Sequence, residues 1–185
     1  MGHDITVIVL IVLLVGAIGV TTVYFAASRI DRLHRRLDRA WDTMAIQLTR
    51  RASVAAHLAL IGIWDPVTSI VVSAAAQEAL EAPPDDTAHS ELSAVLRQAL
   101  GEDENVNQDL SNRDKAEWLS LLWGVWYRAQ LARRFYNEAV SMTVRLRSRR
   151  AARLFHLAGR VPMPVTCDID DAAPPALEQA AASNP

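Results

Sequence analysis

Chemically reactive residues are scarce in this sequence. It contains one cysteine, Cys167, so no disulfide can form within the chain, and a reducing compartment fits this usage. Cys167 has no obvious basic partner beside it, which favours an inert thiol over a nucleophile. None of the five histidines has a second histidine or a cysteine at the spacing of metal ligands on one helix. We therefore expect neither a metal site nor a cofactor.

The sequence also lacks the patterns of common active sites. Two of its seven glycines, Gly16 and Gly19, fall in an apolar segment and the others are isolated, so no Gly-rich phosphate loop is present. Acidic residues are plentiful, but they cluster in predicted loops and on polar helix faces, where solvation explains them better than a catalytic pair of carboxylates. No catalytic or cofactor-binding residue stands out, and we expect that the protein is not an enzyme.

Charge is missing from one long segment, residues 5–27, which is long enough to cross a bilayer as a helix. The alternative is a cleaved signal peptide. Against it, no basic n-region precedes the segment, the apolar run exceeds the ~7–15 residues of a typical signal core, and a helical pattern follows directly. We predict a transmembrane helix over residues 5–27, preceded by a short external N-terminus at residues 1–4.

Several arginines follow the apolar segment, and none precedes it. One such segment predicts a single-pass protein of the cell membrane. Positive charge next to a span stays on the cytoplasmic side, which gives the orientation. The N-terminus should lie outside and residues 28–168 should form a cytoplasmic domain. The arginines that support this orientation are Arg29, Arg32, Arg35, Arg36 and Arg39.

Strand signals are absent, since no run alternates Val, Ile or Thr with polar residues between turns. Apolar residues instead recur at steps of three and four, which predicts an all-α fold. The first cytoplasmic helix should end near Trp64, and the sequence leaves open whether it continues the transmembrane helix. Asp65 followed by proline predicts a second helix over residues 66–82. A third helix is predicted over residues 87–100, closed by Gly101.

The last long helix is predicted to follow an acidic loop at residues 101–111 and to run to about Gly159. Arg51 interrupts the apolar stripe of the first helix, whereas the stripe of the last helix is continuous. Leu122 and Trp126 belong to this second stripe, and we expect both to be buried.

Beyond the last helix, Pro162 and Pro164 prevent further helix formation. Residues 169–185 are rich in proline, alanine and aspartate, so we predict a disordered tail. The whole pattern predicts an N-terminal transmembrane helix followed by an up-and-down bundle of about four helices, two long and two short. The alternative is a bare hairpin of the two long helices with a mobile cap.

Charges are segregated along the chain. Residues 78–117 hold eleven acids and three bases, whereas residues 128–160 hold nine arginines and one acid, Glu138. The basic run can bind anionic lipid, bind nucleic acid, or pair with the acidic segment and solvent. A last helix that returns toward the bilayer would place this run beside the arginines after the span, which favours anionic lipid. Few aromatic residues interleave with it, so no nucleic-acid partner is expected. Its members are Arg145, Arg147, Arg149, Arg150 and Arg153.

A resemblance to a known family rests on the C-terminal half of the chain. Residues 132–140 read ARRFYNEAV, residues 153–155 read RLF and residues 161–164 read VPMP. With the N-terminal apolar segment, these stretches resemble the LemA family, and the chain looks most like a divergent actinobacterial branch of it. The resemblance covers roughly residues 5–168. Its specific part is the motif Arg133, Tyr136 and Asn137.

The resemblance implies a membrane-anchored helical bundle and supplies no reaction, because the family has no established activity or active site. The chain departs from the family pattern at Trp126 and Tyr127, where the family usually carries an acid. It departs again at residues 107–110, where the family usually has Tyr-Pro. For Asn137, which lies in mid-helix, we expect a side-chain hydrogen bond across the bundle, with binding to a partner as the alternative.

These patterns favour a membrane-anchored helical scaffold or adaptor without catalytic activity. It would contact the lipid bilayer through its basic residues and bind an unidentified protein partner. The alternative is a membrane-tethered sensor or regulator that transmits a signal through the transmembrane helix, although four external residues are too few for a ligand-binding domain. A homo-oligomer is compatible with the sequence, although Gly16 and Gly19 lack the four-residue repeat of a helix-dimer motif.

Overall fold

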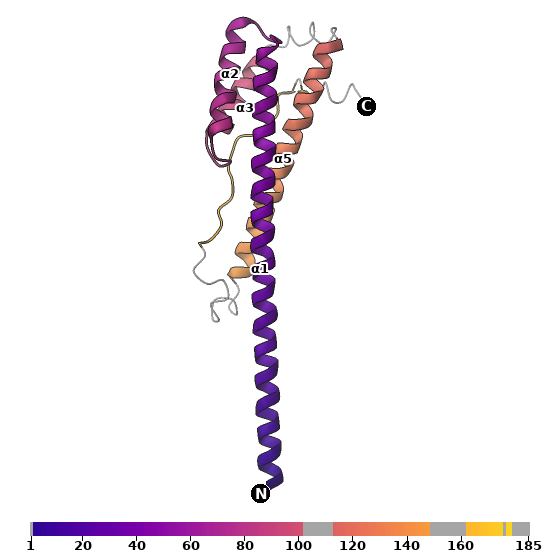
Figure 1. The fold of residues 1–185 in the computed structure, drawn as a ribbon, viewed down its shortest axis with the longest axis vertical. Helices are drawn as coiled ribbons and strands as arrows, with labels where there is room; N and C mark the ends of the chain where they lie inside the picture. Colours follow the sequence, from indigo (N-terminus) through magenta and orange to yellow (C-terminus); the bar gives the residue numbers. More distant parts are fainter. Residues whose placement is uncertain (1, 102–112, 149–161, 176, 179–185) are drawn as a thin grey trace. The chain divides into compact units, whose positions relative to one another are not determined.

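The computed structural model describes residues 2–101, 113–148, 162–175 and 177–178. Within these ranges the regular elements are α-helices and no strand occurs, so the predicted all-α class is confirmed. The principal helices are α1 (Gly2–Leu60), α2 (Pro66–Glu81), α3 (Ala88–Gly101) and α5 (Arg113–Arg147) (Figure 1).

The first part of α1 is the apolar segment. The window from Ile5 to Thr22 has a mean hydropathy of 2.7, and none of it is buried within the protein. Leu13 and Leu14, for example, are 64% and 62% exposed. By length and composition this part of α1 is able to cross a membrane, and the prediction of an N-terminal helix with that property is confirmed.

α1 is unbroken over its 59 residues, which answers the question of continuity that the sequence left open. No proline precedes Pro66, so nothing in the sequence interrupts the hydrogen-bond ladder. The hydroxyl groups of Thr21 and Thr22 donate to the carbonyl groups of Ala17 and Gly19, both at 2.8 Å. Polar side chains near the end of the apolar window are therefore satisfied within the helix itself.

The end of α1 is fixed by Gly62, whose φ of +73° lies in the left-handed region that favours glycine. The amide of Gly62 donates to the carbonyl of Ala59 at 3.3 Å, and the amide of Ile63 donates to the carbonyl of Leu58 at 3.4 Å. This pair of bonds is a Schellman cap. α1 therefore ends at Leu60, earlier than the predicted end near Trp64, because the chain reverses at the glycine.

An aspartate lies just before the start of α2 and of α3. The carboxylate of Asp65 accepts hydrogen bonds from the amides of Val67 and Thr68 at 3.0 and 3.2 Å. Asp86 lies two residues before the start of α3, and its carboxylate accepts one hydrogen bond from the amide of Ala88 at 2.9 Å. Local capping of this kind can be recognised in a sequence, and both helices agree with their predicted bounds to within one residue.

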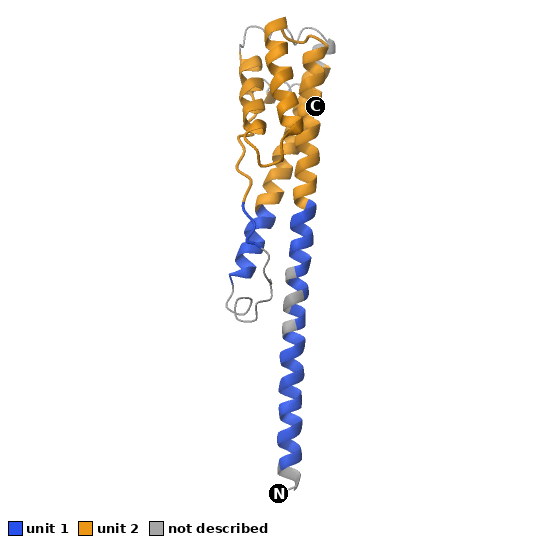
Figure 2. Ribbon diagram, turned by 60° about the vertical axis from the view of Figure 1, so that its left-hand side comes forward, with its two compact units in different colours: residues 1–39, 138–165 blue, residues 40–137, 166–185 orange. Residues whose placement is uncertain are grey.

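The chain divides into two compact units, residues 1–39 with 138–165 and residues 40–137 with 166–185, called unit 1 and unit 2 below (Figure 2). Unit 2 has one hydrophobic core to which all four principal helices contribute, so the helical bundle is confirmed. The alternative of a bare hairpin is wrong, because α2 and α3 are built into this core. Its side chains include Ala52, Ala55, Leu58, Val72, Ala76, Ala79, Leu92, Leu96, Leu100, Leu119, Leu122 and Trp126.

The C-terminal segment is also part of unit 2. Cys167, Ile169 and Asp171 are buried while the residues between them are exposed, which is the alternation of an extended chain packed on one side. Pro174 and Leu177 are fully buried. The prediction of a disordered tail is therefore wrong for residues 169–175 and 177–178. Residue 176 and residues 179–185 lie outside the described part of the chain.

The described part of α5 ends at Arg147, and the amide of Ser148 still donates to the carbonyl of Val144 at 3.0 Å. The predicted extension of this helix to Gly159 falls in residues 149–161, which are outside the described part of the chain. The same holds for residues 102–111 of the predicted acidic loop. Leu122 and Trp126 on α5 are both fully buried, as predicted.

Candidate functional site

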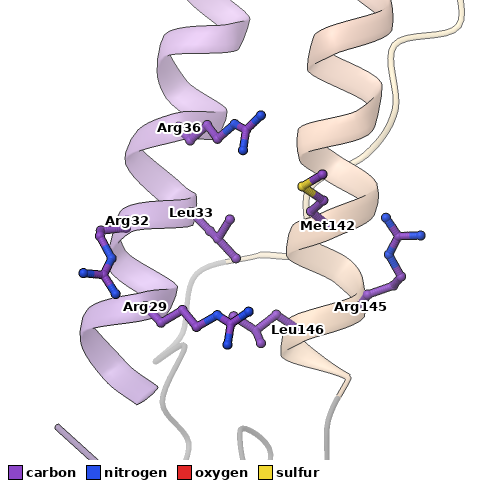
Figure 3. A pocket seen from close by; sticks show the side chains of 7 residues that line it. All are labelled: Arg29, Arg32, Leu33, Arg36, Met142, Arg145 and Leu146. Carbon is purple, nitrogen blue, oxygen red and sulfur yellow. The ribbon is translucent and has the colours of Figure 1, made fainter. Parts of the chain in front are cut away.

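Unit 1 contains a hollow between α1 and α5, with a volume of about 600 Å³. Helical periodicity explains its composition, because residues three or four apart on a helix share a face. One wall is formed within residues 29–36 of α1 and the other within residues 142–146 of α5. The side chains that line it are Arg29, Arg32, Leu33, Arg36, Met142, Arg145 and Leu146 (Figure 3).

The interior of the hollow is apolar and its edge is cationic. Leu33, Met142 and Leu146 are half-buried and lie between the two helices, whereas the four arginines are exposed (Figure 3). Arg29 and Arg36 extend from α1 toward α5, and the guanidinium groups of the other two arginines lie on the outer flanks. Such a site can bind an anion that also carries an apolar portion.

Within the described residues, no carboxylate forms an ion pair with the four arginines at this edge of the hollow. The acids of unit 1 whose side chains the structure describes are Asp31, Asp38 and Glu138, and all three are exposed and absent from the lining of the hollow. The positive charge of the hollow is therefore available to a ligand from outside the protein.

The structure brings together only part of the predicted basic patch. Arg29, Arg32 and Arg36 from the first group share the hollow with Arg145 from the second. Arg35 and Arg39 lie on α1 outside the lining, and Arg39 donates from Nε to the carbonyl of Arg35 at 3.0 Å. Arg147 donates to the carbonyl of Pro162 at 2.8 Å. The remaining predicted members, Arg149, Arg150 and Arg153, lie outside the described residues.

The motif residues of the family resemblance hold the C-terminal segment against α5. Arg133 forms a two-pronged ion pair with Asp171, at 2.6 Å from Nε and 2.8 Å from the terminal nitrogen. The hydrogen bond to Asp171 raises the pKa of Arg133. The backbone carbonyl of Asp171 also accepts hydrogen bonds from Trp126 and Gln130, at 2.9 and 2.7 Å. One residue of the C-terminal segment is thus recognised by three side chains of α5.

Asn137 makes a reciprocal pair of hydrogen bonds with the backbone of Cys167. Its amide nitrogen donates to the carbonyl at 3.0 Å, and its amide oxygen accepts from the N–H at 2.9 Å. The predicted side-chain bond exists, but its partner is the extended C-terminal segment and not another helix. Tyr136 is buried and packs against Trp41 with ring centroids 5.2 Å apart. In this structure the motif therefore has a structural role.

Unit 2 also contains a fully buried arginine, Arg51, which the sequence showed only as a break in an apolar stripe. Its guanidinium donates to the hydroxyl of Ser93 at 3.0 Å and to the carbonyl of His89 at 2.8 Å. It also lies 5.0 Å from the ring centroid of Trp126, within the range of a cation–π interaction. The signal that could have revealed it was its position in the stripe, where an exposed arginine would be out of place.

Burial dominates the electrostatics around Arg51. It lowers the pKa of Arg51 to about 10, and the charge of Asp171 opposes this effect. Burial also lowers the pKa of His89, and the neighbouring positive charge of Arg51 lowers it further. The Nε of Arg51 and the Nδ1 of His89 have no hydrogen-bond partner among the described residues. The lowered pKa of His89 favours its neutral form.

Cys167 is the one thiol in the chain, and it is buried. Burial raises its pKa from 9.0 to about 11, and the charge of Asp85 acts in the same direction. A thiol with this pKa is almost wholly protonated at neutral pH and is a poor nucleophile. Within the described residues, no group of three or more His, Cys, Asp or Glu side chains is placed to hold a metal ion.

Comparison of the chain with protein-family models, with curated proteins and with solved structures gives no match. The resemblance to the LemA family therefore rests on the residues quoted above and stays a prediction. The hollow in unit 1 and the contacts in unit 2 are the features from which a function can be argued.

Proposed function

We propose that this protein is a single-pass membrane protein whose helical domain is a scaffold or adaptor without catalytic activity. In this proposal residues 5–27 span the cell membrane, the N-terminus lies outside, and residues 28–168 are cytoplasmic. The basic face next to the span contacts anionic lipid, and the bundle holds a protein partner. The chain would then be a divergent member of the LemA family.

The observation that carries the proposal is the continuity of α1 within unit 1. The same helix contains the exposed apolar window, Ile5–Thr22, and the first arginines of the hollow. Arg29 follows Thr22 by seven residues, which is about 10 Å along an α-helix. A helix inserted through its apolar window would therefore hold these arginines at the edge of the bilayer.

Positive charge supports the proposed orientation. Arginines at the end of a span stay on the cytoplasmic side, and anionic lipids are enriched in the cytoplasmic leaflet. Each arginine close to an anionic surface contributes about 1 kcal/mol to membrane attraction. Among the described side chains, no carboxylate forms an ion pair with the arginines of the hollow, which leaves their guanidinium groups able to contact lipid.

The runner-up function is a sensor or regulator that transmits a signal from the span into the bundle. The unbroken course of α1 favours it, because one helix runs from the apolar window to the core residues Ala52, Ala55 and Leu58. Cross-linking in native membranes separates the two functions. A single stoichiometric partner supports the scaffold. A change in tryptophan fluorescence when the bilayer is altered, which is lost in Trp126→Phe and occurs with no partner captured, supports the regulator.

Reporter fusions test the orientation on which both functions depend. A reporter that is active only in the cytoplasm, fused after Pro185, should be active, and one that is active only outside should be silent. The matched control carries Gln in place of Arg29, Arg32, Arg35 and Arg36, together with added arginines before Ile5, and it should reverse the pattern. An active external reporter on the parent chain would refute the proposed orientation.

A further inference from the structure

The hollow in unit 1 differs from a flat basic surface, because two helices line it and two of its arginines, Arg29 and Arg36, extend from α1 toward α5 (Figure 3). Arg29, Arg32 and Arg36 come from α1 and Arg145 from α5. The chain also uses arginine far more than lysine, with eighteen arginines and one lysine, Lys115. Guanidinium groups bind phosphate through two parallel N–H donors, whereas an ammonium group acts as a point charge. The hollow therefore fits a phosphate better than a diffuse layer of anions.

The charge of the hollow indicates the charge of its ligand. Arg29 and Arg36 carry like charges that extend toward the same hollow, Arg32 and Arg145 add positive charge on its flanks, and no described carboxylate of unit 1 lines the cavity to reduce the repulsion. A ligand with two negative charges relieves the repulsion more than a ligand with one. A phosphate monoester carries about two negative charges at neutral pH, whereas a phosphate diester carries one.

The interior of the hollow indicates what else the ligand carries. Leu33, Met142 and Leu146 are half-buried and present apolar surface between the two helices, beside the arginines. A bare phosphate ion would leave this surface in contact with water. The glycerol and first acyl carbons of a lipid would cover it, and removal of apolar surface from water is favourable.

The position of the hollow along α1 matches a lipid headgroup. Arg29 lies two residues beyond the predicted span 5–27, about 3 Å along the helix, and Arg36 lies about 14 Å beyond it. The polar layer of a bilayer is about 5–8 Å thick on each side of the hydrocarbon. The lower arginines would therefore lie among the headgroups, and the upper ones just above them.

We infer that the hollow is a binding site for one lipid phosphomonoester, of the phosphatidic acid class, whose phosphate is held by Arg29 and Arg36 over an apolar floor, with Arg32 and Arg145 adding positive charge on the flanks. This inference rests on the proposed insertion of α1 into a membrane. It adds a defined stoichiometry and a preference for headgroup chemistry, neither of which a general attraction to anionic lipids requires.

Native mass spectrometry of the full chain in lipid nanodiscs tests the inference. The discs contain neutral phosphatidylcholine with either phosphatidic acid or phosphatidylserine, at matched total negative charge. We expect one retained phosphatidic acid per chain and a preference of about tenfold over phosphatidylserine, since a monoester offers more charge to bidentate donors. Equal retention of the two anionic lipids would overturn the inference.

Two triple variants separate a built site from net charge. Replacement of Arg29, Arg36 and Arg145 by Gln should abolish the preference. The matched control replaces Arg50, Arg128 and Arg134 by Gln, which removes the same charge from exposed positions of unit 2 and should retain the preference. Equal losses in the two variants would show that charge alone acts. Thermal melting monitored by Trp fluorescence confirms that both variants fold.

Two further arms identify the source of the phosphate and the level at which a failure occurs. Soluble glycerol 3-phosphate should not displace the lipid, and full displacement would overturn the lipid as the occupant. Alkaline extraction of the same samples reports insertion into the bilayer. A chain that resists extraction but shows no preference refutes the site alone, whereas a chain that is extracted refutes the proposed function.

Discussion

Arg51 and His89 are two basic side chains buried inside unit 2, and their surroundings favour the charged form of the first and the neutral form of the second. Arg51 stays charged because it donates to Ser93 and to the carbonyl of His89 and lies over Trp126. The same positive charge, added to burial, lowers the pKa of His89. The core therefore accommodates one cation and keeps its neighbour neutral.

Acidification should destabilise unit 2 through His89. Its pKa is lowered from 6.5 in the folded protein, so below about pH 6.5 the unfolded chain binds a proton that the folded chain does not. The free energy of unfolding should then fall as the pH drops from 6.5 toward the lowered folded pKa, by at most about 1.4 kcal/mol per pH unit. Urea midpoints at about pH 7.5 and pH 5.5 measure this loss.

The variant His89→Gln should lose most of this pH dependence, because its amide does not titrate. His57→Gln is the matched control, since His57 is exposed. A pH dependence that survives in His89→Gln and disappears in His57→Gln would contradict the assignment.

At the scale of elements, the C-terminal segment depends most on contacts with other elements for its structure. Its contacts reach residues far away in the sequence, such as Arg97, whose guanidinium donates to Asp170 at 3.1 Å. That pair is exposed and contributes little, whereas the Arg133–Asp171 pair and the Asn137–Cys167 bonds are partly buried. The segment should therefore be held mainly from α5.

The single thiol reports on that attachment. Because the pKa of Cys167 is raised from 9.0 to about 11, its thiolate fraction at pH 8 should be about 100-fold lower than that of an unperturbed cysteine. Reaction with an aromatic disulfide reagent should be correspondingly slow. Asn137→Ala removes both bonds to the backbone of Cys167 and should speed the reaction at least tenfold, as exposure restores the ordinary pKa.

Arg97→Ala is the comparison for this experiment, since it removes an exposed ion pair of the same segment and should change the rate much less. Identical rates for the parent and Asn137→Ala would mean that Asn137 does not hold the segment. The absence of a second cysteine makes the readout unambiguous.

At the scale of the whole chain, two environments stabilise the helices. The core of unit 2 depends on contacts among α1, α2, α3, α5 and Leu177. The apolar window Ile5–Thr22 has no burial within the protein, so its helix depends on its own hydrogen bonds and, in the proposed insertion, on the bilayer. Loss of the core should therefore leave helical structure in the apolar window.

Trp126→Ala tests this separation. Trp126 is fully buried and donates to the carbonyl of Asp171, so its removal should cost about 3–5 kcal/mol of unfolding free energy. In detergent, heating should melt unit 2 at a lower temperature than in the parent, while part of the helical circular dichroism persists in both. An unchanged melting temperature would show that the core of unit 2 does not depend on Trp126.

Features that depend on neighbours in the sequence could be predicted from it. The apolar segment, the start of α2 at Asp65, and the burial of Leu122 and Trp126 follow from composition, capping and helical period. The end of α1 also depends on a local feature, Gly62. The predicted end near Trp64 was too late because the apolar pattern continues beyond the glycine. These features need no knowledge of the rest of the fold.

Other features were decided by contacts between residues far apart in the sequence. Arg51 reaches Ser93 across 42 positions, and Asn137 reaches Cys167 across 30. The C-terminal segment has a composition typical of disorder, and it is ordered because partners on α3 and α5 satisfy its backbone and bury its alternate side chains. Likewise, only packing could show which arginines share one hollow. The sequence supplies the charges and the helices, and the tertiary structure determines which of them meet.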